Sequence, residues 1–182
     1  ATHYVSGTRL ATSGRLTLGG RELAVQGTSW FDHEWGSNQL TPGQIGWDWF
    51  SIHFDDGTEL MLYQMRLRDG GTDAQSSGTF IAADGTTRHL RRNDYRLTPR
   101  HWWKSPRTGK YFVTRWQLTL PGRAGTESFE VTTPVADQEM PRADLTDVPP
   151  GYWEGAIDIV RTAGGAPATR GVGYSEHMPY RR

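Results

Sequence analysis

Residues 30–36 read WFDHEWG, and residues 46–50 read GWDWF. Together these stretches contain four of the chain's eight tryptophans and three carboxylates, gathered around one histidine. Because alternate side chains of a strand share a face, we predict two opposed faces in the first stretch. One face carries Trp30, Asp32 and Glu34, and the other carries Phe31, His33 and Trp35. A polar group in apolar surroundings costs free energy unless it is hydrogen-bonded, so His33 needs a partner if its face is turned inward.

Hairpins are predicted on both sides of this stretch. Gly19-Gly20 separates two short strand segments, residues 15–18 and 22–25, and tolerates the positive φ of a two-residue turn. Residues 47–54 and 59–67 form a second hairpin pattern around residues 55–58. No segment sustains a helical apolar repeat over three turns. The chain is therefore predicted to be all-β, either an up-and-down barrel or a two-sheet sandwich.

The turn of the second hairpin decides which residues face each other. A two-residue Asp56-Gly57 turn places Phe54 opposite Glu59 and Asp48 opposite Met65, with Tyr63 near Asp48. A three-residue turn with a bulge is equally usual for such a sequence and changes these partners. The faces of the two strands are therefore firmer expectations than the pairs.

Composition excludes several classes of function. The 20 basic and 20 acidic residues cancel, so no charge pattern for nucleic acid or an anionic membrane surface is present. The chain has no cysteine, which excludes disulfides and thiolate chemistry. No histidine and carboxylate spacing matches a metal motif, and no apolar run is long enough to span a bilayer. The compartment stays open, because a cytoplasmic chain and a processed secreted or periplasmic chain would look alike.

Six motifs carry a resemblance to a known family. They are GTSWFDHEWG (27–36), GWDWF (46–50), DGTELMLY (56–63), WKSP (103–106), YWEGA (152–156) and GVGYSE (171–176). In this order they resemble the AttH and carotenoid 1,2-hydratase (hydroxyneurosporene synthase) family of lipocalin-like proteins, over nearly the whole chain. The resemblance implies a lipocalin-like antiparallel up-and-down β-barrel.

The resemblance also bears on the domain organisation. Typical family members have two lipocalin-like barrels in tandem, and these motifs belong to the second. We therefore expect residues 1–182 to form a single lipocalin-like barrel domain, with residues 1–26 as a leading hairpin and residues 27–182 as the barrel that bears the motifs. The chain is either a one-barrel relative or a fragment. Its expected partners are an N-terminal barrel or a second copy in a homodimer.

The resemblance assigns roles to several residues. The hydratase pattern of a histidine and a tryptophan two positions later falls on His33 and Trp35, and its tyrosine falls on Tyr63. Its acid falls on Met65, and protonating an alkene needs a positioned acid. Asp48 is the spatial substitute that we expect, with Glu34 as the other candidate acid or orienting group beside the catalytic His33.

The expected substrate is an apolar, unsaturated small molecule such as a polyene, terpenoid or polyketide, handled without a cofactor or metal. The predicted substrate-binding residues are Trp35, Tyr63, Trp49, Trp30, Phe50, Met65, Trp153 and Glu154. The reaction is either acid–base hydration or isomerisation, or a shaping of the substrate for cyclisation as in a Diels-Alderase. A non-catalytic lipid or polyene carrier is the alternative, and a carbohydrate-active sandwich is the outsider, since Asp32 and Glu34 lie at a spacing compatible with paired carboxylates.

Overall fold

The computed structural model describes residues 2–38, 40–122, 125–140, 151–163 and 169–180, and all the regular structure in them is β-strand. Every pairing between these strands is antiparallel. The chain forms two compact units, Ala1–Thr41 and Pro42–Arg182, which we call the ribbon and the barrel. The prediction of an all-β, lipocalin-like chain is confirmed. The leading hairpin is longer than the expected residues 1–26, because its second strand continues to Gly36.

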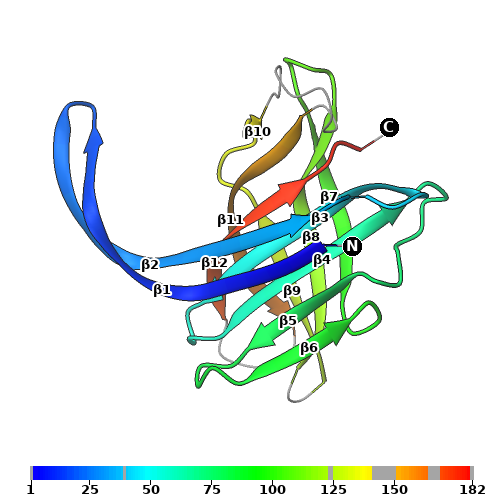
Figure 1. The fold of residues 1–182 in the computed structure, drawn as a ribbon, viewed down its shortest axis with the longest axis horizontal. Helices are drawn as coiled ribbons and strands as arrows, with labels where there is room; N and C mark the ends of the chain where they lie inside the picture. The colour runs from blue at the N-terminus through cyan, green and yellow to red at the C-terminus, as the bar shows by residue number, and fades with distance from the viewer. Residues whose placement is uncertain (1, 39, 123–124, 141–150, 164–168, 181–182) are drawn as a thin grey trace. The chain divides into compact units, whose positions relative to one another are not determined.

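The ribbon consists of two long strands, β1 (Thr2–Leu18) and β2 (Arg21–Gly36). Gly19 and Gly20 turn the chain with φ of 55° and 78°, a conformation that other residues rarely adopt. The register shifts between Gly7 and Leu10, and the two strands curve together along their length (Figure 1). The predicted hairpin around the glycine pair is confirmed.

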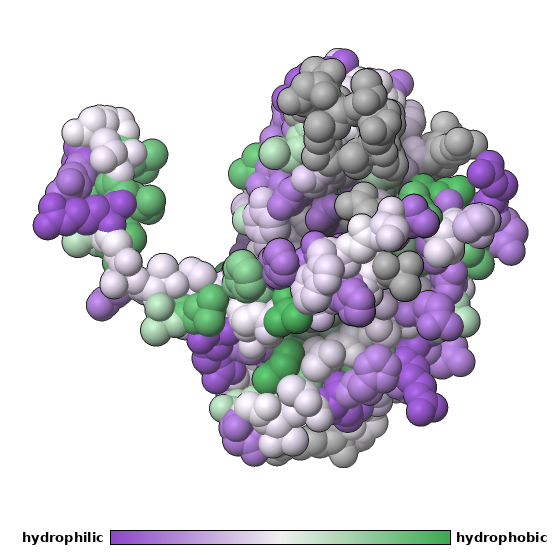
Figure 2. Space-filling model, viewed as in Figure 1, coloured by the Kyte–Doolittle hydropathy of each residue, from purple (hydrophilic) through white to green (hydrophobic). Residues whose placement is uncertain are grey.

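The tip of the ribbon has two unlike faces. Leu16 pairs with Leu23 on one face, and both side chains are exposed. Arg15 and Glu22 form a 2.5 Å ion pair on the other face. Figure 2 shows the resulting hydrophobic and hydrophilic sides of the tip. This separation follows directly from the period of two along each strand.

The barrel contains the other ten strands. Their bounds are β3 (Gln44–Phe54), β4 (Glu59–Leu67), β5 (Ser77–Ile81), β6 (Thr87–Arg91), β7 (Arg96–Lys104), β8 (Tyr111–Gly122), β9 (Gly125–Thr132), β10 (Glu139–Met140), β11 (Tyr152–Ala163) and β12 (Arg170–His177). The order in the sheet is β6-β5-β4-β3-β12-β11-β9-β8-β7, with β10 paired to β11 (Figure 1). The last strand therefore returns to pair with the first, as in an up-and-down barrel. Among the described strands, only the junction between β6 and β7 lacks a ladder of hydrogen bonds.

Side chains on the inner face fill the barrel, including residues of the two strands at this junction. Leu90 of β6 and Leu97 of β7 belong to the same apolar cluster. Phe50, Leu62 and Trp116 in that cluster are at most 1 % exposed. Burial on this scale is the main favourable contribution to folding. Core residues therefore stand on both sides of the open seam.

The hairpin of β3 and β4 corrects one predicted register. His53 pairs with Glu59 and Asp48 with Gln64, so the expected opposition of Phe54 to Glu59 and of Asp48 to Met65 is wrong. The chain turns through three residues, 55–57, because the Gly57 N–H donates to the Phe54 carbonyl and Gly57 has a φ of 81°. The alternative of a three-residue turn is confirmed. It shifts the pairing by one residue and brings Gln64 to the inner face beside Asp48.

Candidate functional site

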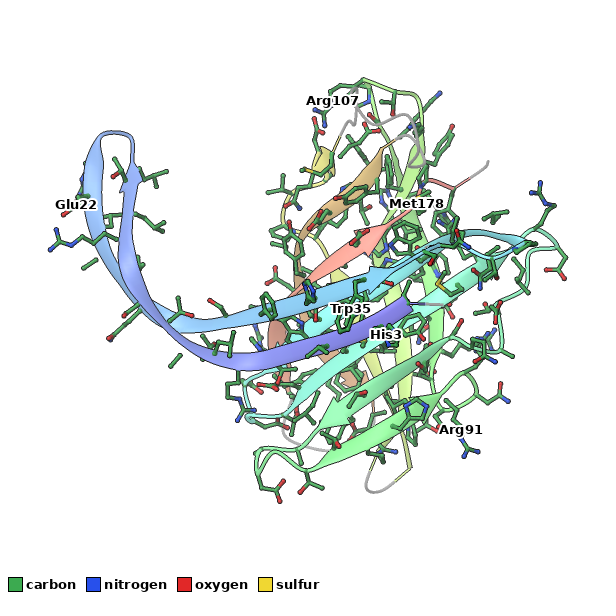
Figure 3. The ribbon with its side chains drawn as sticks, in the orientation of Figure 1. His3, Glu22, Trp35, Arg91, Arg107 and Met178 are labelled. Carbon is green, nitrogen blue, oxygen red and sulfur yellow. The ribbon has the colours of Figure 1, made fainter. Side chains whose placement is uncertain are left out.

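A row of rings lines one face of the ribbon. His33 lies between Phe31 and Trp35, with ring centroids 6.4 Å and 5.0 Å away. His3 on β1 stacks on Trp35 at 5.3 Å (Figure 3). The side chains of His33 and Trp35 are exposed. The predicted pairing of His33 with aromatic neighbours is therefore present on the ribbon, and the imidazole is accessible.

The acidic residues of the same stretch lie on the opposite face. Asp32 Oδ1 accepts hydrogen bonds from Ser6 Oγ at 2.5 Å and from Trp30 Nε1 at 2.9 Å. Glu34 pairs with Tyr4 across the two strands and is exposed. Because strand neighbours alternate between faces, Glu34 and His33 point away from each other within the ribbon. Asp32 is a structural acceptor that ties the two strands together.

Asp48 occupies the interior of the barrel. Its Oδ2 atom accepts hydrogen bonds from Tyr180 at 2.7 Å and from Gln64 at 2.9 Å, and it lies 3.4 Å from Arg66 Nε. His177 Nδ1 is 3.3 Å from Asp48 Oδ1, in a geometry that is not that of a regular hydrogen bond. Strands β3, β4 and β12 and the C-terminal segment thus meet at one buried carboxylate.

The charges of this cluster follow from its burial. Burial by itself raises the pKa of Asp48, but Arg66, His177 and Gln64 together outweigh it and hold that pKa below its ordinary value. Burial lowers the pKa of His177, and the adjacent carboxylate offsets this only in part. Burial and then Asp48 raise the pKa of the Tyr180 phenol. At neutral pH the cluster is a buried Asp48–Arg66 ion pair with a neutral His177 and a protonated Tyr180.

Arg66 also fastens the C-terminal segment. Its Nη2 atom donates to the Met178 carbonyl at 2.7 Å, and its guanidinium lies 3.8 Å from the centre of the Tyr180 ring. The Met178 N–H donates to the Trp47 carbonyl at 3.0 Å. Figure 3 shows Met178 just beyond the end of β12. The ion pair therefore holds the last described residues against β3.

Aromatic rings enclose His177. The centroids of Phe50 and Trp116 are both 5.2 Å from its ring, and that of Trp153 is 5.5 Å away. The gap beside these rings is too narrow for a water molecule. Phe50 and Trp153, which we expected to contact substrate, are instead packed in this core at 0 % exposure. This part of the interior is filled by the protein's own side chains.

Other predicted residues gather on the outer face of the barrel. Trp49 pairs with Tyr63, and Trp47 with Met65, across β3 and β4. Glu154 of β11 lies directly opposite Glu176 of β12 on the same face. The Tyr63 hydroxyl donates to the Gln75 carbonyl and accepts from Ser77 Oγ, both at 3.1 Å. The structure therefore brings Trp49, Tyr63, Met65 and Glu154 to one surface and places Asp48 behind it.

Sequence reasoning missed most of the interior cluster. Gln64 and Arg66 lie on the same strand face as Leu60 and Leu62. Two polar residues at the end of an apolar strand face were the signal in the sequence for a buried polar cluster. The partnership with His177 joins residues 129 positions apart on β3 and β12. No local pattern in the sequence indicates that pairing.

The described residues hold no group of three or more His, Cys, Asp or Glu side chains placed to bind a metal ion. They also include no helix with the length and apolar character needed to cross a membrane.

The antiparallel strand order, with β12 returning to β3, defines a lipocalin-like protein. The model of the AttH-like family matches residues 1–180, so the chain belongs to the AttH-like family. This confirms the resemblance that the six motifs indicated. A search of the curated proteins found no match.

Solved structures share the fold, among them the following two. One is a protein from Nitrosomonas europaea described as AttH, with 32 % identity, a TM-score of 0.79, and coverage of 97 % of this chain and 52 % of the other. The second is kievitone hydratase from Nectria haematococca, with 20 % identity, a TM-score of 0.74, and coverage of 98 % of this chain and 53 % of the other. The chain therefore spans about half the length of each of these two proteins.

Proposed function

We propose that this chain is a lipocalin-like protein of the hydratase type, which acts on an apolar, unsaturated small molecule by acid–base chemistry without a cofactor. The observation that carries the proposal is the exposed His33 imidazole between Phe31 and Trp35. Membership of the AttH-like family and the likeness of the fold to that of kievitone hydratase support the same class.

His33 has the chemistry that the reaction needs. An imidazole both gives and takes a proton near neutral pH. The flanking rings offer an apolar surface to the substrate, and the negative faces of their π systems stabilise a developing positive charge. His33 is accordingly the proposed acid–base residue, and Trp35 is its substrate-facing neighbour. Glu34 points away from His33 on the other face of the ribbon, so this proposal gives it no contact with the imidazole.

The barrel, taken by itself, carries a separate surface that we propose for contact with an apolar ligand. Trp49 and Tyr63 form an aromatic surface beside Met65 and Glu154 on its outer face. Phe50 and Trp153 support this surface from the core, and Trp30 stiffens the ribbon through its bond to Asp32. In this proposal Asp48 is a positioning residue for β3, because its carboxylate is already engaged by Tyr180, Gln64 and Arg66.

The same rows of rings also suit a role without proton transfer. A polyene laid along stacked aromatic side chains is held in a fixed conformation, which can promote cyclisation through orientation alone. A carrier of a lipid or polyene needs only the apolar contact. Both alternatives predict that the ring of residue 33 matters and that its titratable nitrogens do not.

Three variants separate these functions. The assay supplies an acyclic carotene in ¹⁸O-labelled water and measures a product heavier by one labelled water molecule. Under the proposed chemistry, His33→Ala and His33→Phe both lose turnover by a factor on the order of 100 or more, while His89→Ala on exposed β6 keeps it. Binding of the carotene, followed by quenching of tryptophan fluorescence, should persist in His33→Phe. Full turnover in His33→Phe would assign the residue to shaping or carrying and would refute the acid–base role.

A further inference from the structure

The basic residues of the barrel are concentrated in one stretch of the chain. Residues 77–122, which contain strands β5 to β8, include nine Lys and Arg and two acidic residues, so their formal charge is +7. The rest of the chain holds the other 11 basic and 18 acidic residues, so its charge is −7. The chain is neutral as a whole, and its net charge therefore gave no sign of a cationic surface. The expectation that no charge pattern suits an anionic surface does not hold for this stretch.

Strands β5 to β8 carry no carboxylate, and we call them the cationic wall. Their basic residues are all exposed, namely Arg88 and Arg91 on β6, Arg96, Arg100 and Lys104 on β7, and Arg115 on β8. Strands β6 and β7 end the sheet order and flank the open seam, with β5 and β8 as their outer neighbours. The two acids of the stretch belong to turns, where Asp84 and Asp94 accept hydrogen bonds from backbone N–H groups at 2.9 Å and 2.8 Å.

Arginines on both sides of the seam point away from the core. Leu90 and Leu97 belong to the core cluster and are at most 9 % exposed. Because adjacent strand residues face opposite sides, the next residue Arg91 and the preceding residue Arg96 face outward. Figure 3 shows Arg91 at the end of β6. No carboxylate in the part of the chain that the structure describes forms an ion pair with either guanidinium. Their charges are therefore available to a partner.

The neighbouring part of the barrel has the opposite charge. Strands β9, β11 and β12 carry five acidic residues, Glu127, Glu130, Glu154, Asp158 and Glu176, and two arginines, Arg161 and Arg170. The border lies where β8 pairs with β9, and Arg115 Nε is 3.9 Å from Glu130 Oε2 there. A barrel with one cationic and one anionic side turns its cationic side toward a negatively charged surface.

We infer that the cationic wall docks the barrel on the surface of an anionic lipid bilayer. The guanidinium fork binds phosphate oxygens through paired hydrogen bonds. Trp103 is half-buried on β7 beside the exposed Lys104, and tryptophan next to a cation is typical of side chains that settle among lipid headgroups. A strand of nucleic acid follows one groove lined by stacking rings, whereas these cations spread over both sides of the seam. The inference rests on the proposed function in one respect, because an apolar substrate dissolves in a bilayer and has to be collected there.

The test measures co-sedimentation of the full chain with vesicles of phosphatidylcholine that contain about 30 % phosphatidylglycerol. Each Lys or Arg near such a surface strengthens binding about fivefold, so the double variant Arg91→Gln with Arg96→Gln should bind about 25-fold more weakly. The control Arg68→Gln with Arg170→Gln removes the same charge from exposed positions outside the wall and should stay within about threefold of the wild type. The wild type should not bind vesicles of phosphatidylcholine alone, and salt at about 0.5 M should release it from the anionic vesicles.

Several results would overturn the inference. Equal losses in the two double variants would assign binding to net charge, and equal binding to vesicles of phosphatidylcholine alone would assign it to apolar contact. The variant Arg91→Lys with Arg96→Lys keeps both charges and should keep its affinity within about threefold, so a loss as large as that of the glutamine variant would also contradict the inference. If the wild type binds single-stranded DNA of mixed sequence through these arginines and does not bind the vesicles, the wall serves nucleic acid.

Vesicle binding needs no turnover, so its outcome is independent of the carotene assay. Binding through the cationic wall without hydration of the carotene would leave the docking surface standing and refute the proposed function. Hydration without binding to the anionic vesicles would refute the docking surface alone.

Discussion

Replacing Asp48 by asparagine should strongly destabilise the barrel. The two side chains have the same shape, and asparagine keeps an oxygen that can accept from Gln64 and Tyr180, so the substitution chiefly removes a charge. Asp48 Oδ2 lies 3.4 Å from Arg66 Nε, a separation at which two unit charges attract by about 5 kcal/mol at an effective dielectric constant of about 20. Removing one partner of a buried ion pair typically costs about 3–5 kcal/mol. We therefore expect Asp48→Asn to lose about 4 kcal/mol of unfolding free energy.

Urea unfolding followed by tryptophan fluorescence measures this loss. With an m-value of about 2 kcal/mol per M, the transition midpoint should fall by about 2 M. The double variant Asp48→Asn with Arg66→Met should be more stable than Asp48→Asn alone, because no uncompensated charge then stays buried. Glu130→Gln breaks the exposed 3.9 Å contact to Arg115 and should leave the midpoint unchanged. A loss below about 1 kcal/mol for Asp48→Asn, or a double variant no better than the single one, would refute the electrostatic reasoning.

Other perturbations have equally definite signs. Because burial lowers the pKa of His177, the unfolded chain binds the proton more tightly than the folded chain. The free energy of unfolding should therefore decline as pH falls below about 6.5, by up to about 1.4 kcal/mol per pH unit. His177→Phe should remove this pH dependence from urea midpoints measured between pH 5 and pH 7.5. Gly173→Ala would place a Cβ 2.1 Å from the Ser51 carbonyl oxygen, so we expect a loss of about 3 kcal/mol or no soluble protein, and normal stability would contradict this packing. Tyr180→Phe removes a 2.7 Å hydrogen bond to a buried carboxylate and should cost about 1.5–3 kcal/mol, less than Asp48→Asn in the same urea titration.

Local turn chemistry explains which parts of the fold the sequence could predict. The Gly19-Gly20 pair has positive φ at both positions, and it located the first hairpin because few residues other than glycine adopt that conformation. Alternation correctly placed His33 with Phe31 on one face. These features depend on residues that are close together in the chain, so local sequence patterns can predict them.

In the second hairpin, the register between the two strands depends on the length of the turn. Two-residue and three-residue turns were both compatible with residues 55–58, and the choice between them moves every partner by one position. The three-residue turn puts Gln64 opposite Asp48, and Arg66 follows on the same inner face. With a two-residue turn, Asp48 would lie opposite Met65 among apolar side chains. With the three-residue turn, its carboxylate has polar partners. The sequence is compatible with both turns. Because a buried carboxylate without partners costs free energy, the three-residue turn is favoured.

The pairing of β3 with β12 links the stability of the barrel to the ligand contacts proposed for its surface. Asp48 and His177 face inward as a register pair, while their chain neighbours Trp49 and Glu176 face outward as the next one. The buried ion pair therefore fixes the outer residues without touching anything bound there. A variant that weakens the cluster should lower the fraction of folded protein and leave the ligand affinity of the folded fraction nearly unchanged. Such a division between inner and outer positions is what a single antiparallel strand pair can provide, because its two faces alternate along one backbone.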